Sequence, residues 1–294
     1  MSILKFDNVS KIFYTKEHQT VAIDKLSFEI NEGEFVALIG PSGCGKTTVL
    51  SLVCGLLQPT SGKIIRGQQS VTPAACEVLP DNKGGKNTAD DKTKQKADVP
   101  KRSRRFIFKP KDNGNCKVGY MLQRDQLFEW RTIWRNVTLG LEVQNKMTNE
   151  NTEKAKSLLK KYGLWDFRKH YPQQLSGGMR QRAALIRTLA TNPDLLLLDE
   201  PFSALDFQTR LDVCDDVYDI IKKENKTALL VTHDISEAIA LADKVIVLTA
   251  RPATVKAIHY TNMGDIDTPL HRRQSPDFSR QFEYLHNLLH GNVN

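Results

Sequence analysis

Residues 40–48 spell GPSGCGKTT, a stretch that satisfies the phosphate-loop pattern G-x-x-x-x-G-K-[ST]. The apolar run Phe35–Ile39 precedes it, and the stretch Thr48–Val53, which is typical of a helix, follows it. A strand, a glycine-rich turn and a helix in this order form the context in which the pattern binds phosphate. Glycines let backbone N–H groups turn towards an anion, and the helix N-terminus adds unpaired donors. The stretch therefore predicts an α/β fold that binds a nucleotide.

Within this loop, Lys46 offers a positive charge to the outer phosphates, and the hydroxyl of Thr47 can ligate Mg²⁺. The alternative is a glycine-rich turn without a ligand, which the flanking strand and helix disfavour. The loop residues that we expect to contact the nucleotide are Gly40, Pro41, Ser42, Gly43, Cys44, Gly45, Lys46, Thr47 and Thr48.

A second apolar run, Leu195–Leu198, is bounded by Pro193 and leads into Asp199 and Glu200. Such a run is typical of a central parallel strand, and ligands bind at the carboxyl ends of these strands. Adjacent strand residues point to opposite faces, so the two carboxylates can act separately. We expect Asp199 to face the metal and Glu200 to face a water molecule.

Two further segments have the same character. Ser176 is a good N-cap before a stretch of helical period, and Gly177 and Gly178 follow it, so a glycine-rich turn again meets a helix N-terminus. The run Ala228–Val231 predicts another buried strand, with His233 just beyond its carboxyl end. A lone histidine is more often structural, but this placement matches that of the other candidate residues.

The chain has 294 residues and a net charge of +8, and no apolar stretch approaches the ~18 residues of a membrane span. Its N-terminus lacks the apolar core of a signal peptide, so we expect a cytoplasmic protein with at most a peripheral membrane role. Between Arg66 and Lys117, 13 Lys/Arg oppose 6 Asp/Glu, which accounts for seven of the positive charges. The region of about 68–117 is polar and poor in large apolar residues, which predicts a flexible basic insertion.

The remaining patterns outline the rest of the chain. Alternating apolar residues near Leu4–Val9 and Leu26–Ile30 predict half-buried antiparallel strands before the phosphate loop. Apolar runs at Val118–Leu122 and Val245–Leu248 predict short strands. After Arg251 we expect an irregular polar tail that ends in an amphipathic helix with the apolar positions Phe278, Phe282, Leu285, Leu288 and Leu289.

Together these motifs resemble, in the same order, the ATP-binding subunits of ABC transporters. The motifs are GPSGCGKTT at 40–48, Gln123, LSGGMRQR at 175–182, LLLLDEP at 195–201, SALD at 203–206 and His233. The resemblance covers residues 1–250 apart from the insertion. It implies a RecA-like P-loop NTPase core with an antiparallel β subdomain and a helical subdomain at about 124–192. Residues 251–294 would form a short C-terminal extension.

Within that superfamily, residues 119–140 and 272–289 look like the nitrate, sulfonate and taurine importers, features that thiamine-precursor pyrimidine importers share. The insertion departs from their usual pattern, as does Glu129, which stands where those relatives often have proline.

The resemblance also implies roles for single residues. Glu200 would act as the general base, His233 would contact the γ-phosphate, and Gln123 would contact the metal and the attacking water. Asp199 would bind Mg²⁺ together with Thr47. Phe13 would stack on adenine, with Tyr14 as the alternative. The residues expected to meet the nucleotide of a second copy are Ser176, Gly177 and Gly178.

The implied assembly is a homodimer around two MgATP that drives permease subunits docked near Gln123–Asn136, at the cytoplasmic face of the membrane. An extracytoplasmic solute-binding protein would be an indirect partner. Trp130 and Trp134 lie in the docking segment and are equally consistent with docking and with local packing. The main alternative is a soluble ABC ATPase that acts on nucleic acid or ribosomes, which only the basic insertion supports. A regulatory module without turnover is disfavoured by the presence of Glu200 and His233.

Overall fold

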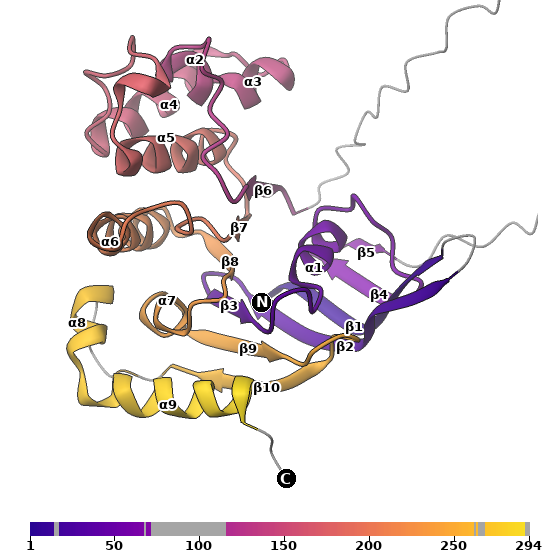
Figure 1. Cartoon of the computed structure of the whole chain (residues 1–294). Coiled ribbons are helices and arrows are strands. Elements are labelled where there is room, and N and C mark those ends of the chain that lie inside the picture. Colours follow the sequence, from indigo (N-terminus) through magenta and orange to yellow (C-terminus); the bar gives the residue numbers. More distant parts are fainter. Residues whose placement is uncertain (15–17, 68, 72–115, 262, 264–267, 292–294) are drawn as a thin grey trace, which may run out of the picture. The chain divides into compact units, whose positions relative to one another are not determined.

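A computed structural model describes residues 1–14, 18–67, 69–71, 116–261, 263 and 268–291. The predicted insertion at about 68–117 lies almost entirely outside these ranges. The described residues of the compact unit 1–73 and 115–294 contain two β-sheets and their helices (Figure 1). The division into a domain at 1–250 and an extension at 251–294 stays a prediction.

The larger sheet has six strands in the order β10-β9-β3-β8-β7-β6. Five of them run parallel, and each crossover places a helix on a face of the sheet (Figure 1). The strands are β3 (Phe35–Ile39), β6 (Val118–Met121), β7 (Leu195–Asp199), β8 (Thr227–Val231), β9 (Lys244–Leu248) and β10 (Val255–Tyr260). The predicted parallel strands are confirmed, and every residue of β3, β8 and β9 is buried, as their apolar runs indicate.

The expectation of an irregular tail after Arg251 is wrong for its first part. Strand β10 pairs antiparallel with β9 and forms an edge of the sheet. Its side chains alternate between half-buried and exposed, a period-two pattern too short and too polar to distinguish from a loop. The amphipathic helix predicted at the end of the tail is present as α9 (Pro276–His290), and its Leu285 is fully buried.

The smaller sheet has four antiparallel strands in the order β2-β1-β4-β5, which confirms the predicted N-terminal strands. They are β1 (Ser2–Tyr14), β2 (Gln19–Asn31), β4 (Ser61–Arg66) and β5 (Gln69–Val71). Phe6 and Phe28 face each other across β1 and β2 with ring centroids 4.6 Å apart. This aromatic pair helps to fix the register of the two strands.

Helix α1 (Lys46–Val53) follows the phosphate loop, and four helices lie between β6 and β7. The remaining helices are α2 (Ile133–Val137), α3 (Leu139–Val143), α4 (Asn149–Lys161), α5 (Gly177–Leu189), α6 (Phe207–Lys223), α7 (Ile235–Leu241) and α8 (Pro269–Gln274), with a 3₁₀ turn at Pro172–Gln174. Helix α4 buries its apolar residues Ala155 and Leu159.

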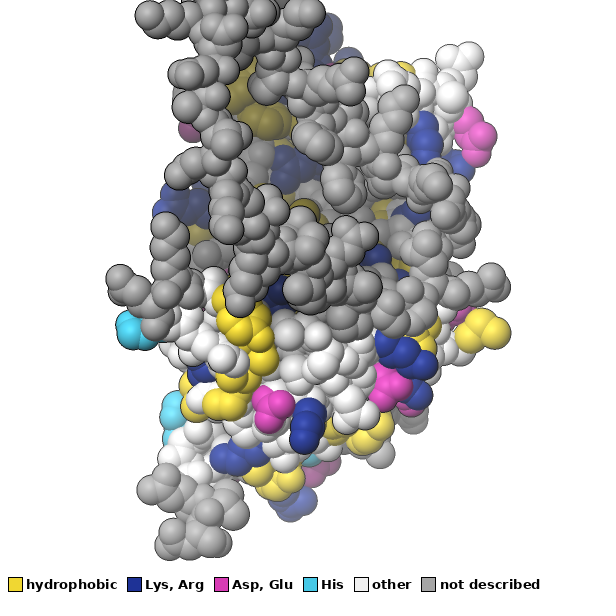
Figure 2. Space-filling view, turned by 90° about the vertical axis from the view of Figure 1, so that its right-hand side faces the viewer, with side chains coloured by type: hydrophobic (Ala, Val, Ile, Leu, Met, Phe, Trp, Pro, Cys, Tyr) yellow, Lys and Arg dark blue, Asp and Glu magenta, His cyan; other side chains and the backbone are white. Residues whose placement is uncertain are grey.

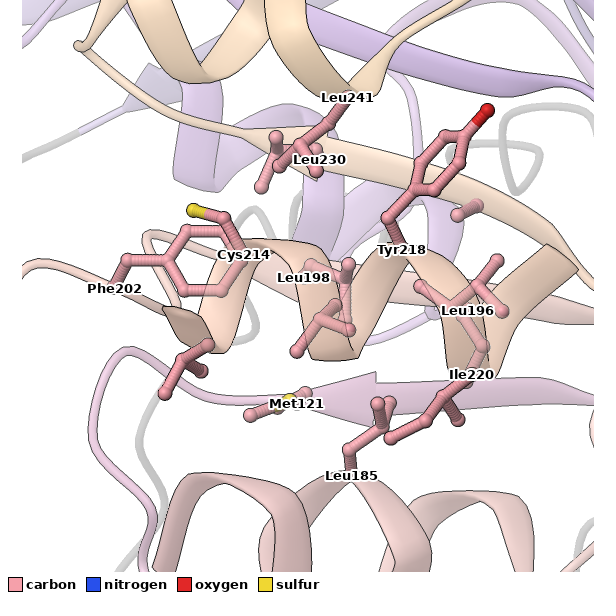
Figure 3. Packing of buried hydrophobic residues seen from close by; sticks show 14 of the residues in the cluster. Met121, Leu185, Leu196, Leu198, Phe202, Cys214, Tyr218, Ile220, Leu230 and Leu241 are labelled. Carbon is pink, nitrogen blue, oxygen red and sulfur yellow. The ribbon is translucent and has the colours of Figure 1, made fainter. Parts of the chain in front are cut away.

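The two faces of the larger sheet belong to different hydrophobic clusters. One face packs on α1 and the antiparallel sheet through residues such as Leu38, Leu197 and Val49. The other packs on α5, α6 and α7, where Leu198, Phe202 and Leu185 interdigitate (Figure 3). On the face drawn in Figure 2, Lys and Arg side chains of the described residues are scattered among acidic and hydrophobic ones. Because both faces of the larger sheet are packed, its strands are held in place, and this fixes where the loops of the site emerge.

Gly62 in β4 is a position where a side chain is sterically forbidden. It has a φ of 77°, and an added Cβ would lie 2.1 Å from the backbone oxygen of Asn8. We expect Gly62→Ala to lower the free energy of unfolding by about 3 kcal/mol or more, measured by urea denaturation. Gly33 is the matched control, with a φ of 78° and nothing within 4 Å of an added Cβ. Gly33→Ala should cost about 1 kcal/mol, and equal losses in the two variants would contradict the steric argument.

Candidate functional site

The candidate site lies where β3, β6, β7 and β8 end, because the carboxyl ends of parallel strands share one edge of a sheet. The phosphate loop emerges from β3, Gln123 follows β6, and Asp199 ends β7. His233 comes two residues after β8. The fold therefore brings together candidate residues that are far apart in the sequence.

The phosphate loop is wrapped around the side chain of Lys46. This residue is only 8% exposed, and its ammonium group donates to the carbonyls of Gly40 (2.8 Å) and Pro41 (3.1 Å). Gly43 and Gly45 have φ values of 72° and 127°, which a side chain would disfavour. The loop thus holds a cation at its centre and turns sharply into α1.

Asp199 is half-buried, and its carboxylate accepts a 2.8 Å hydrogen bond from the hydroxyl of Tyr120. Burial raises the pKa of Asp199 and the nearby Glu200 raises it further, whereas Tyr120 and Lys46 lower it. Burial and the bond to Asp199 raise the pKa of Tyr120, so its hydroxyl remains a donor. The sequence analysis missed Tyr120; its only signal was a hydroxyl in an apolar strand.

Glu200 lies between two other candidate residues. The amide of Gln123 donates to its Oε2 at 3.2 Å, and Nδ1 of His233 lies 3.3 Å from its Oε1. Glu200 has a φ of 43°, so the alternation of β7 stops at Asp199 and the next carboxylate is turned out of the strand. The two carboxylates therefore have different partners, with Glu200 held between Gln123 and His233.

Hydrogen bonds among the residues on either side of His233 fix the turn that carries it. Asp234 caps α7 by accepting from the N–H groups of Ser236 and Glu237. The spacing of Asp234 and Glu237 matches a capping box, but Glu237 does not accept from the N–H of Asp234. Its buried carboxylate instead accepts a 2.6 Å hydrogen bond from the hydroxyl of Thr232, whose oxygen accepts from the N–H of Asp234.

Burial raises the pKa of Glu237 from 4.5 to about 7, and this predicts a pH dependence of stability. Between these pH values the folded state binds more protons than the unfolded state. The contribution of Glu237 to the free energy of unfolding is therefore fully present below pH 4.5 and is lost as the pH rises through 7. In Glu237→Gln, the decrease in the free energy of unfolding between pH 4.5 and 8 should be smaller by on the order of 2 kcal/mol. Urea denaturation across that range measures the effect. Parallel pH profiles for the two proteins would contradict it.

The glycines predicted as a turn before a helix, Gly177 and Gly178, are the first two residues of α5 and pack within the fold. The hydroxyl of Ser176 accepts from the N–H of Met179 as the N-cap, as predicted. An added Cβ at Gly178 would lie 2.9 Å from Val213 on α6, and one at Gly177 would lie 3.2 Å from Leu205. These glycines allow α5 to approach α6 and the loop after Glu200 closely.

Both aromatic candidates for adenine stacking are at the end of β1. Phe13 is 37% exposed with the ammonium of Lys11 5.3 Å from its ring centroid, whereas Tyr14 is 68% exposed. Each ring is accessible to a ligand, so the alternative between them remains open.

The segment Gln123–Asn136 presents aromatic side chains at the surface. Trp130 is 75% exposed, and its ring lies 4.8 Å from that of Phe128. Trp134 is instead partly buried and packs edge-on against Trp165. The buried side-chain amide of Asn136 bonds to both backbone groups of Phe128 and to the carbonyl of Arg131, which fixes the segment.

Among the described residues, no group of three or more His, Cys, Asp or Glu side chains is placed to hold a metal by itself. No helix in the described part of the chain is both long and apolar enough to span a bilayer.

Comparisons with known proteins agree with this geometry. Residues 23–203 match the family model described as ABC transporter. A Bacillus subtilis protein described as an uncharacterized ABC transporter ATP-binding protein is 40% identical, over 97% of this chain and 95% of its own length. The nitrate import ATP-binding protein of Synechocystis is 34% identical, over 98% of this chain and 95% of its own length. A solved dimeric ATP-binding cassette bound to ADP and phosphate superposes with a TM-score of 0.63 at 28% identity, over 89% of this chain and all of its own.

Proposed function

The chain belongs to the ABC transporter family, and from this premise we propose that it is the ATP-hydrolysing subunit of a membrane importer. The observation that carries the ATPase part of the proposal is the Glu200 carboxylate, held by Gln123 and His233, and the nitrate-import relative supports the importer part. A carboxylate oriented by two side chains from other segments is suited to activate a water molecule.

The site also fits Mg²⁺. Burial and the nearby Glu200 destabilise the charged form of the half-buried Asp199 carboxylate. A bound divalent cation would stabilise that charged form. Thr47 is exposed at the start of α1 and can add its hydroxyl. When bound there, the ion would neutralise developing negative charge on the phosphates.

In the proposed mechanism, the loop N–H groups and Lys46 bind the phosphates of ATP. Glu200 accepts a proton from the attacking water, and Gln123 contacts the same water molecule. His233 contacts the γ-phosphate. Catalysis rests on the positions of these groups and on their charges. The exposed ring of Phe13 or Tyr14 would stack on adenine.

Two copies of the chain would form the working unit. Ser176, Gly177 and Gly178 lie at the N-terminus of α5, which can donate to an anion. We propose that they meet the γ-phosphate held by the partner, in a head-to-tail homodimer around two ATP molecules. The dimeric cassette with 28% identity supports this arrangement.

The exposed aromatic pair Phe128–Trp130 would contact a permease at the cytoplasmic face of the membrane. Loss of the γ-phosphate contacts would open the dimer, and the segment Gln123–Asn136 would transmit the motion because Gln123 at its start contacts Glu200. Relatives named as nitrate, taurine and aliphatic-sulfonate import proteins favour a small anion such as nitrate, a sulfonate or taurine as the solute. A thiamine-precursor pyrimidine is the alternative solute in this proposal. An extracytoplasmic solute-binding protein would be an indirect partner.

The test is to isolate the chain with its membrane partners and to measure which solute stimulates ATP hydrolysis. Stimulation by nitrate, taurine or an alkylsulfonate, with Trp130→Ala abolishing the stimulation but not the basal rate, is the expected result. Recovery of the chain with RNA and without a multi-span partner would overturn the importer proposal.

A further inference from the structure

The loop that joins β7 to α6, residues 200–206, begins at the proposed base Glu200 and ends at Asp206, the N-cap of α6. Its first half is fixed by Ser203, whose hydroxyl and N–H both donate to the carbonyl of Glu200. Gln181 on α5 donates to the carbonyl of Pro201. We call residues 200–206 the β7–α6 loop. Its position determines where the carboxylate of Glu200 points.

Arg210, in the first turn of α6, fixes the second half of this loop. Its Nη2 donates to the carbonyl of Leu205 at 3.1 Å, and its backbone N–H donates to the carbonyl of Asp206 at 2.9 Å. The side chain of Leu205 is also nearest to an added Cβ at Gly177, so Leu205 packs against the first turn of α5.

The same guanidinium group faces the turn that carries His233. Nη1 of Arg210 lies 3.8 Å from Oδ2 of Asp234. The other oxygen of Asp234 caps α7, so its Oδ2 remains to face the guanidinium. Glu237 and His233 are the other titratable groups of this turn, and the buried Glu237 bonds to Thr232.

These contacts close a ring. It runs from Glu200 along the β7–α6 loop to Leu205, through Arg210 to Asp234, and back through His233 to Glu200. Within this ring, the Arg210 guanidinium contacts a backbone carbonyl of the β7–α6 loop and the carboxylate of Asp234 in the His233 turn. A planar fork with several donors can hold two acceptors at a fixed separation, whereas a lysine ammonium is a point charge.

We propose that Arg210 is a positioning residue, which ties the β7–α6 loop to the His233 turn so that Glu200 and His233 face the γ-phosphate in one fixed geometry. This inference rests on the proposed function, because it takes Glu200 as the base. Displacements of about 1 Å at a reacting group can lower turnover by up to ~10²-fold. Removal of the tie should therefore act on kcat and not on nucleotide affinity.

The test uses the full-length chain, with Mg-ATP hydrolysis measured as kcat and KM for each variant. Arg210→Met keeps the apolar stem and should lower kcat about 10-fold with KM changed less than about 2-fold. Arg210→Lys should restore part of kcat. Asp234→Asn retains the cap of α7 but loses the charge, and the double variant with Arg210→Met should be no slower than Arg210→Met alone.

Arg273→Met is the matched control, since Arg273 pairs with Asp215 on α6 at 3.5 Å and touches none of the ring. It should leave kcat unchanged. Wild-type kcat in Arg210→Met, additive effects of the Arg210 and Asp234 changes, or a raised KM with normal kcat would each overturn the tie. Should Arg210→Met not fold, Arg210→Lys and Asp234→Asn carry the same comparison. Failure of the proposed function is distinct, because Glu200→Gln would then retain turnover whatever Arg210→Met does.

Discussion

Replacing Glu200 by Gln is expected to lower the rate of ATP hydrolysis by about 10³-fold. The change removes a proton acceptor and keeps the shape of the side chain. An amide oxygen can still accept from Gln123, whose donor lies 3.2 Å from the carboxylate in the native chain. ATP binding should survive, because the phosphate loop and Lys46 are untouched. Steady-state hydrolysis and a separate measurement of ATP affinity check both parts.

The control for this variant is Glu283→Gln, an identical chemical change on the exposed surface of α9. It should leave both turnover and affinity unchanged. The decisive outcome against the assignment is normal turnover in Glu200→Gln. A parallel loss of ATP affinity would show instead that Glu200 supports the loop and not the chemical step.

The parts of the site that were predictable from the sequence are local. The glycines and Lys46 of the phosphate loop follow a strand and precede a helix within a short stretch, so pattern and context lie together. Asp199 and Glu200 end a run of apolar residues that only a buried strand explains. The same logic placed His233 after β8.

The remaining features depend on contacts between distant segments. Tyr120 reaches Asp199 because β6 is the neighbour of β7, and the sequence does not state the strand order. The link from Arg210 to Asp234 and the bond from Thr232 to Glu237 likewise need the packed fold. Trp134 differs from Trp130 only through its packing on Trp165. Spacing alone could not separate these two residues.

Lys46→Ala is expected to weaken ATP binding by about 10- to 100-fold, the range for losing a charge-assisted hydrogen bond. The native Lys46 residue is only 8% exposed, and its ammonium already donates to the carbonyls of Gly40 and Pro41. A ligand phosphate would meet a cation whose position is set before binding. The variant loses both the charge and the donor that shapes the loop. Calorimetric titration with ATP and Mg²⁺ measures the change.

Two further variants separate charge from loop shape. Lys46→Arg keeps the charge, but the larger planar group does not fit the buried slot between two carbonyls, so affinity should remain low. Lys63→Ala removes a lysine of the antiparallel sheet that is 47% exposed and 4.0 Å from Asp7, and it should leave affinity unchanged. Full affinity in Lys46→Arg would show that charge alone suffices. Full affinity in Lys46→Ala would mean that the nucleotide is held elsewhere, because a loop built around this ammonium would then have no part in binding.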